Sequence, residues 1–105
     1  MKLLTEEMKE RLPEPEEIRD EEDPKVLAKF FHPTSGWTWY ITAFEPEREI
    51  FLGLVDGQFL EYGSFSLKEL KEVSGALGLG IERDKYFDPV SLSKLREKLE
   101  RGEHV

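Results

Sequence analysis

The chain has 105 residues and carries 15 lysine and arginine side chains against 23 aspartate and glutamate side chains, for a formal net charge of -8. This length fits a single domain, expected over residues 1–105, and no apolar run approaches the ~20 residues that a membrane span needs. The absence of cysteine excludes disulfides, thiolate nucleophiles and cysteine-based metal centres, and an acidic start without an apolar stretch favours the cytoplasm over secretion.

A short helix is the first predicted element. Thr5 is the expected N-cap, because its hydroxyl can accept a hydrogen bond from a free amide of the first turn. Leu4, Met8 and Leu12 recur at the spacing that places side chains on one face of a helix. We therefore expect this narrow apolar stripe to pack against the core.

An acidic segment follows the helix. Between residues 14 and 23 there are seven carboxylates and one cation, Arg19, and three prolines interrupt any helix through the surrounding region. Ile18 is the only apolar anchor. The composition predicts an exposed acidic loop over residues 13–24.

Four strands are predicted next, over residues 25–31, 37–44, 49–55 and 58–65, in an antiparallel meander. In the second of them, strict alternation would turn one set of side chains toward the core and leave the other set partly exposed. The core set comprises Trp37, Trp39, Ile41 and Ala43, and the partly exposed set comprises Thr38, Tyr40, Thr42 and Phe44. Asp56-Gly57 predicts a tight type I′ hairpin turn, which needs positive φ at both central residues.

Helices return in the last third of the chain. Ser66 and Glu69 form a capping box, and Gly75 is the expected end of that helix. Residues 80–83 can add a short strand. Asp88 is the expected cap of a last helix that Gly102 ends, leaving a frayed C-terminus at residues 102–105. The predicted fold is α+β, an antiparallel four- to five-stranded meander sheet with three short helices packed mainly on one face.

No catalytic, cofactor or metal site is expected. Of the two histidines, His104 lies beside the end of the chain, and His32 precedes a proline in a turn. His32 and Ser35 are close in sequence, but local spacing is no evidence for a catalytic geometry, so we interpret His32 as a surface turn residue. The acidic loop lacks the spacing of a calcium loop, and the glycines at 75–80 follow a helix instead of opening one.

Two further groups of residues have competing interpretations. Glu82, Arg83 and Asp84 form a possible ion-pair cluster, which binds a ligand or, as we favour, locks a loop to the sheet. Trp37 and Trp39 can stack single-stranded nucleic acid or fill the core. We favour the core, because the chain is acidic and shows no basic stripe that would hold phosphates.

Aromatic residues are numerous, at 11% of the chain, and a small domain has limited interior for them. If helices cover only one sheet face, Tyr40, Phe44, Phe51 and Phe59 can form an exposed patch. This patch predicts a non-enzymatic protein that acts through protein–protein contact, with a homo-oligomer as the expected form. The alternative is a nucleic-acid-directed factor, either a single-strand binder or an acidic DNA mimic.

Several segments resemble one known family. They are Phe-Phe-His-Pro at 30–33 with Trp-Thr-Trp-Tyr at 37–40, Phe-Leu-Gly-Leu-Val-Asp-Gly at 51–57, the stretch 61–70, and Gly-Leu-Gly-Ile-Glu-Arg-Asp at 78–84. In this order they are similar to the domain-of-unknown-function family numbered 2958, small bacterial proteins often found on plasmids and other mobile elements. The resemblance implies a mobile-element accessory role and carries over no catalytic residue. Separately, the absence of asparagine and the single glutamine, Gln58, are typical of thermophile proteins.

Overall fold

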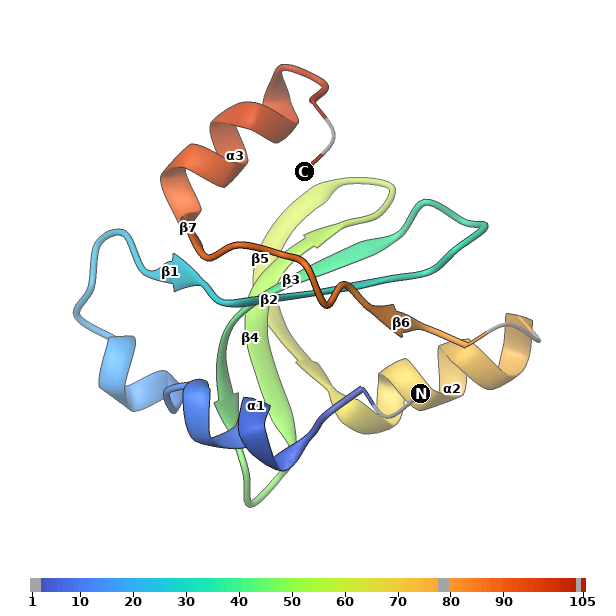
Figure 1. The fold of residues 1–105 in the computed structure, drawn as a ribbon, viewed down its shortest axis with the longest axis horizontal. Helices are drawn as coiled ribbons and strands as arrows, with labels where there is room; N and C mark the ends of the chain where they lie inside the picture. The colour runs from blue at the N-terminus through green and yellow to red at the C-terminus, as the bar shows by residue number, and fades with distance from the viewer. Residues whose placement is uncertain (1–2, 78–79, 104) are drawn as a thin grey trace.

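The computed structural model describes residues 3–77, 80–103 and 105, and it has the predicted α+β fold (Figure 1). The elements are the helices α1 (Glu6–Arg11), η1 (Pro15–Ile18, a 3-10 helix), α2 (Leu67–Leu77) and α3 (Leu92–Glu100), and the strands β1 (Lys25–Val26), β2 (Ala28–Phe31), β3 (Thr38–Glu45), β4 (Ile50–Asp56), β5 (Leu60–Ser66), β6 (Glu82–Arg83) and β7 (Val90–Ser91). Five strands form an antiparallel sheet in the order β5-β4-β3-β2-β6, and β1 pairs with β7 in a second, two-stranded sheet. None of the helices in the described part of the chain is long and apolar enough to cross a membrane.

The main core lies between one face of the five-stranded sheet and the helices α1 and α2. The predicted stripe of Leu4, Met8 and Leu12 is buried there, together with Leu70 of α2. Phe51 is at the centre of an aromatic group, with its ring centroid 4.7 Å from that of Phe44 and 5.5 Å from that of Phe30. Two of the three α-helices thus cover one face, as predicted.

The opposite face is also covered, so the expectation that it is wet is wrong. Val26, Tyr40, Leu54 and Leu95 form a second buried cluster, in which α3 and β1 pack against the sheet. Figure 1 shows α3 and α1 at opposite ends of the molecule. Because α1 and α2 cover one face of the sheet and α3 with β1 covers the other, β3 is buried on both sides.

Local capping largely follows the sequence. Thr5 Oγ1 accepts a hydrogen bond from the Met8 amide at 3.2 Å, and Ser66 Oγ accepts one from the Glu69 amide at 3.0 Å. Gly102 has φ of 80°, the left-handed conformation expected where α3 ends. These side chains act within a few residues of themselves, so sequence spacing predicts them well.

Two helix boundaries differ from the prediction. Helix α2 continues through Gly75 to Leu77, because a glycine inside a helix costs only about 1 kcal/mol, which packing can offset. Helix α3 begins at Leu92 with Ser91 as its N-cap, not at Asp88. The residues before Leu92 are drawn into a strand, since Val90 pairs with Val26 of β1.

The predicted strand at 25–31 is two strands. Lys25 and Val26 pair with β7, whereas Ala28 to Phe31 pair with β3. Val26 belongs to the cluster under α3 and Ala28 to the main core. The alternation of side chains is therefore interrupted at Leu27, so that Val26 and Ala28 point to opposite sides of the sheet. The Leu27 amide still donates to the Ile41 carbonyl at 2.8 Å.

A bulge in β3 overturns the predicted alternation. Ile41 is opposite Gly53 and Ala43 is opposite Leu52, so Thr42 is an extra residue in β3. Beyond this point the phase of the strand is reversed, and Phe44 packs in the main core beside Ile41. The two-residue alternation of side chains along a regular strand does not predict such a reversal.

The β4–β5 hairpin forms, but its turn is not the predicted one. Asp56 pairs with Leu60, which leaves a loop at 57–59, and Gly57 is not among the described residues with positive φ. Glycine at position 57 makes room for a neighbouring side chain: a Cβ atom there would lie 2.4 Å from the Trp37 indole, which would have to move. Trp37 is 39% exposed and rests on this hairpin, whereas Trp39 is buried as expected.

Candidate functional site

The predicted aromatic patch does not form. Tyr40, Phe44 and Phe51 are buried within the chain, so the prediction that they lie on an exposed surface is wrong. The second cluster covers Tyr40, and the bulge in β3 turns Phe44 into the main core. Phe59 alone of the four is exposed, at 73%, in the loop between β4 and β5.

The charged residues at 82–84 connect the sheet to its neighbours. The Asp84 carboxylate lies 3.8 Å from the Lys29 ammonium of β2. The Arg83 guanidinium lies 3.4 Å from Thr5 Oγ1, at the start of α1. Glu82 pairs with Phe31 through the backbone. The three residues thus extend toward different partners, and Arg83 and Asp84 hold β6 beside α1 and β2.

His32 is buried, so its interpretation as a surface residue is wrong. Its side chain is 3% exposed, and its Nδ1 accepts a hydrogen bond from the Ser35 amide at 3.0 Å. That bond places the proton of the neutral ring on Nε2, which has no hydrogen-bond partner. The Ser35 hydroxyl instead accepts from the Trp37 amide at 3.2 Å, so the histidine and serine contact each other through the backbone and shape a turn.

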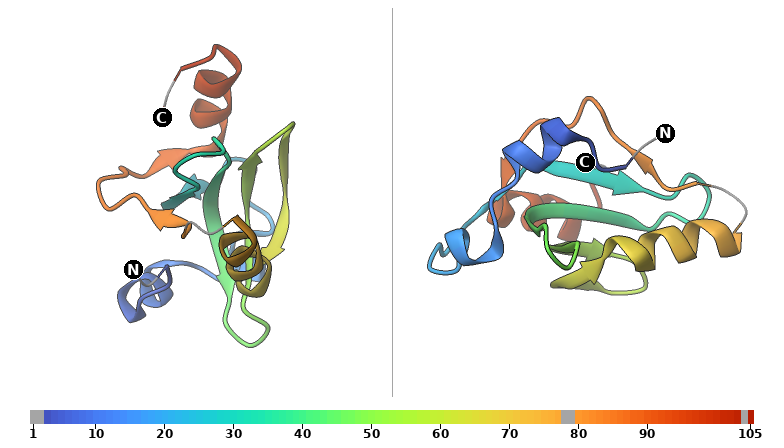
Figure 2. Two further views of the ribbon diagram at one scale, coloured as in Figure 1. Left: turned by 90° about the vertical axis from the view of Figure 1, so that its right-hand side faces the viewer. Right: turned by 90° about the horizontal axis from the view of Figure 1, so that it is seen from below.

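The outer edge of β5 is open. β5 is the last strand of the sheet, and within the described residues only β4 pairs with it (Figure 2). Its pairing with β4 is regular from Leu60 to Ser66, with no bulge. The strand carries one charge, Glu61, and no proline. A long, regular edge with so little charge can pair with a further strand.

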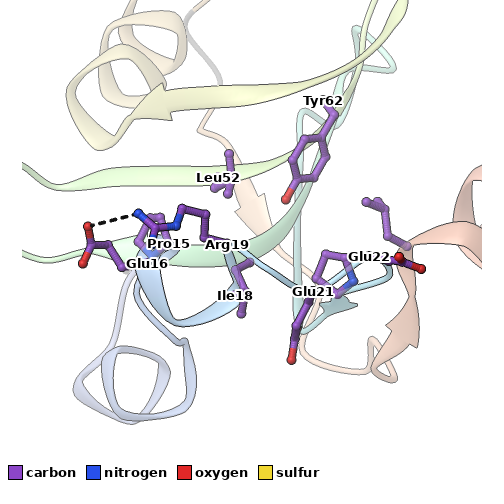
Figure 3. A pocket seen from close by; sticks show the side chains of 10 residues that line it. Pro15, Glu16, Ile18, Arg19, Glu21, Glu22, Leu52 and Tyr62 are labelled. Carbon is purple, nitrogen blue, oxygen red and sulfur yellow. Dashed lines mark ion pairs between the residues drawn. The ribbon is translucent and has the colours of Figure 1, made fainter.

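Beside this edge is a cavity of about 430 Å³, which we call the acidic pocket (Figure 3). Leu52 of β4 and Tyr62 of β5 provide one wall, and the acidic segment provides the other. The lining residues are Pro15, Glu16, Ile18, Arg19, Glu21, Glu22, Pro24, Leu52, Tyr62 and Leu92. Ile18, the expected apolar anchor of the segment, lies opposite Leu52 and Tyr62, and no local pattern in the sequence indicates that these two strands face it.

Hydrogen bonds hold the acidic segment at both of its ends. The Phe44 amide donates to the Pro13 carbonyl at 2.9 Å, and the Leu92 amide donates to the Pro24 carbonyl at 2.9 Å. Asp23 accepts from the Ser93 hydroxyl at 2.6 Å and from the Ser93 amide at 2.8 Å. These two bonds lower the pKa of the Asp23 carboxyl below its ordinary value. The carboxylates of this segment are exposed, as expected, but its backbone is fixed to the sheet and to α3.

The Tyr62 ring is held in place from behind. The Tyr62 hydroxyl lies 2.8 Å from Thr42 Oγ1. The Thr42 hydroxyl in turn donates to the Leu52 carbonyl at 3.0 Å. Thr42 is the extra residue of the β3 bulge, so the bulge orients one wall of the acidic pocket. The pocket can therefore offer an ordered aromatic ring in a cavity that glutamates also line. No group of three or more metal-ligating side chains gathers in the described residues.

Comparison with known proteins identifies one family. The family model described as "Protein of unknown function (DUF2958)" matches residues 3–104. No curated protein and no solved structure matches the chain. The match spans the sheet, all three α-helices and the acidic segment, so it covers the residues of the acidic pocket and of the β5 edge together.

Proposed function

This chain belongs to the DUF2958 family, and we propose that it acts as a non-enzymatic protein–protein contact module that self-associates through the open edge of β5. The observation that carries the proposal is the regular β5 edge, whose outward backbone groups pair with no other strand in the part of the chain described. Exposed N–H and C=O groups in a row are a template for a further antiparallel strand.

The edge is suited to a second copy of itself. β5 runs from Leu60 to Ser66, so Gly63 is its central residue. An antiparallel two-fold pairing about Gly63 would place Tyr62 opposite Ser64 of the second copy, and it would join two five-stranded sheets into one. A side chain at position 63 would point into open space on one face of the sheet, so a substitution there can test the pairing without disturbing the fold of the chain. Phe59, just beyond the strand, would face the start of the α2 helix of the second copy.

Charge opposes this association without preventing it. Each copy carries a net charge of -8, so two copies repel one another at low ionic strength. The contacting strands contribute little to that repulsion, because Glu61 is their only charged residue. We therefore expect association to strengthen as salt rises from about 0.01 M to 0.15 M, where the screening length falls from about 30 Å to about 8 Å.

Light scattering coupled to gel filtration tests the proposal. The wild-type chain should run as a dimer at tens of micromolar, near twice its 12.3 kDa mass. Gly63→Lys should run as a monomer, because the two-fold register places like charges opposite each other. Tyr86→Lys adds the same charge at a side chain that is 91% exposed beside the opposite edge of the sheet, and this variant should remain a dimer. A monomeric wild-type chain, or equal behaviour of both variants, would contradict self-association through this edge.

A binding assay with single- and double-stranded DNA tests the alternative of a nucleic-acid-directed factor. We expect no binding at physiological salt, because the chain is acidic and the Lys29 ammonium already lies 3.8 Å from Asp84. Tight binding that weakens steeply with salt would show phosphate contacts and would place the alternative first.

A further inference from the structure

We propose that the acidic pocket binds a small organic cation, a protonated amine carried on an apolar body. This inference is independent of self-association, because it concerns the cavity between the acidic segment and the sheet and not the outer edge of β5. It rests on three features of the pocket: its apolar walls, its surplus of unpaired carboxylates and its fixed shape (Figure 3).

The walls suit an apolar body of modest size. Ile18, Leu52 and Leu92 supply aliphatic surface from three separate parts of the chain, and Tyr62 supplies a ring. The volume of about 430 Å³ lies within the range of about 300–1,000 Å³ that is typical of small-molecule sites. An extended protein surface would need a larger contact, so the size of the cavity favours a small ligand over a macromolecule.

The charge of the rim selects a cation. Glu16, Glu21 and Glu22 line the cavity together with one cation, Arg19. The Arg19 guanidinium lies 4.0 Å from the Glu16 carboxylate, so these two opposite charges partly neutralise each other. Glu21 and Glu22 are exposed, form no ion pair with another described residue, and belong to the lining of the cavity. Their charges attract an ammonium group and repel an anion.

The pocket is formed before any ligand arrives. The acidic segment is attached to Phe44 at its start and to Leu92 at its end, in both cases through backbone hydrogen bonds of 2.9 Å. Asp23 adds two bonds to Ser93, and Thr42 holds the hydroxyl of Tyr62. A ligand would therefore lose little affinity to ordering the segment.

Three probes that share a phenyl ring on a short alkyl chain separate charge from apolar contact. They are phenethylamine as the cation, 2-phenylethanol as the neutral analogue and 3-phenylpropanoate as the anion. In NMR titrations of the full chain we expect the cation to shift the Leu52 methyl and Tyr62 ring signals. It should bind about fivefold more tightly than the alcohol, as one exposed charge contact predicts, and the anion should leave these signals unchanged.

Paired variants of the acidic segment identify the carboxylates involved. Glu21→Gln with Glu22→Gln removes the two unpaired charges of the rim and should reduce the affinity for phenethylamine about fivefold. Glu14→Gln with Glu17→Gln makes the same charge change in the same segment, outside the acidic pocket, and should change affinity less than twofold. All four side chains are exposed, so both variants should fold normally.

Several outcomes would overturn the proposal. Equal binding of the amine and the alcohol would show an apolar groove without charge selection. Equal losses in both paired variants would show a response to net charge alone. Shifts elsewhere in the chain, or none at millimolar probe, would show that the cavity is not a site. The monomeric Gly63→Lys chain should bind the amine as the wild-type chain does, so failure of self-association is distinguishable from failure of this site.

Discussion

The two edges of the sheet differ in length and in charge. β6 has two residues, both charged, and Asp84 and Lys85 continue the charged run. β5 at the other edge has seven residues and a single charge. Short, charged edges resist pairing with other strands, whereas long and nearly neutral ones invite it. Among the described residues, the β6 edge is thus short and charged, whereas the β5 edge is long, nearly neutral and unpaired.

This difference between β5 and β6 shows that each edge of a sheet is protected against further strand pairing by the residues around that edge. At β6, Arg83 extends to Thr5 and Asp84 pairs with Lys29, so side chains from other elements fix the edge. At β5 the outward side is bounded by no other strand of the described residues.

The largest effect is expected from a pair of glycines that face each other across β4 and β5. A Cβ at Gly53 would lie 2.0 Å from the Tyr40 carbonyl oxygen, which cannot move away without disrupting β3, whereas position 63 is open. Gly53→Ala should lower the free energy of unfolding by about 3 kcal/mol or more, and Gly63→Ala should change it by less than about 0.5 kcal/mol. Urea unfolding measures both. Similar losses would mean that β5 is packed as tightly as the inner strands.

The next effect concerns the hairpin that carries β5. Gly57→Val places a side chain against the Trp37 indole and should cost about 1–3 kcal/mol of unfolding free energy, by overpacking and not by turn strain. Thermal and urea unfolding check the loss. In the Trp37→Ala background the indole is absent, and the same substitution should cost much less. An undiminished cost there would locate the strain in the backbone of the turn.

High pH should weaken the packing of α3 against the sheet, where Tyr40 is buried. Burial, with a smaller contribution from the Asp56 charge, raises the pKa of Tyr40 from 10.0 to about 12. The folded chain therefore keeps the Tyr40 proton between pH 10 and 12 while the unfolded chain releases it, so stability present below pH 10 is lost as pH approaches 12. The melting temperature should fall over this range. Tyr40→Phe should flatten the fall, and Tyr86→Phe, at a side chain 91% exposed, should leave it unchanged.

The smallest effect is expected from the ion pair beside β6. Asp84→Asn removes the charge that faces Lys29 but keeps an oxygen for the Tyr86 amide, which donates to Asp84 at 2.9 Å. The unfolding free energy should fall by about 0.5–1 kcal/mol, and less at high salt. Urea unfolding at two salt concentrations measures this. A loss independent of salt would show that hydrogen bonding, not charge, holds this edge.

Much of the fold was predictable because the signals were local. Thr5 and Ser66 cap helices through neighbours three residues away, and the strands were placed by composition and by the turns between them. The errors lie where distant segments meet. The predicted patch failed because α3 returns to cover Tyr40, and the split at Leu27 reflects packing on two different sides of the sheet.

Local signals in the sequence were sufficient for the α+β class, the Thr5 and Ser66 caps, the antiparallel order of the four strands from β2 to β5, and the exposed acidic segment with Ile18 as its anchor. Only the tertiary structure decided that Thr42 bulges out of register, that Phe44 and Phe51 are interior, and that Leu52 and Tyr62 lie opposite the acidic segment. The two groups of features differ in the sequence distance over which the interactions that produce them act. Capping and turn preferences act over a few residues, whereas burial and cavities depend on which remote segments pack together, and that choice is made by the whole chain at once.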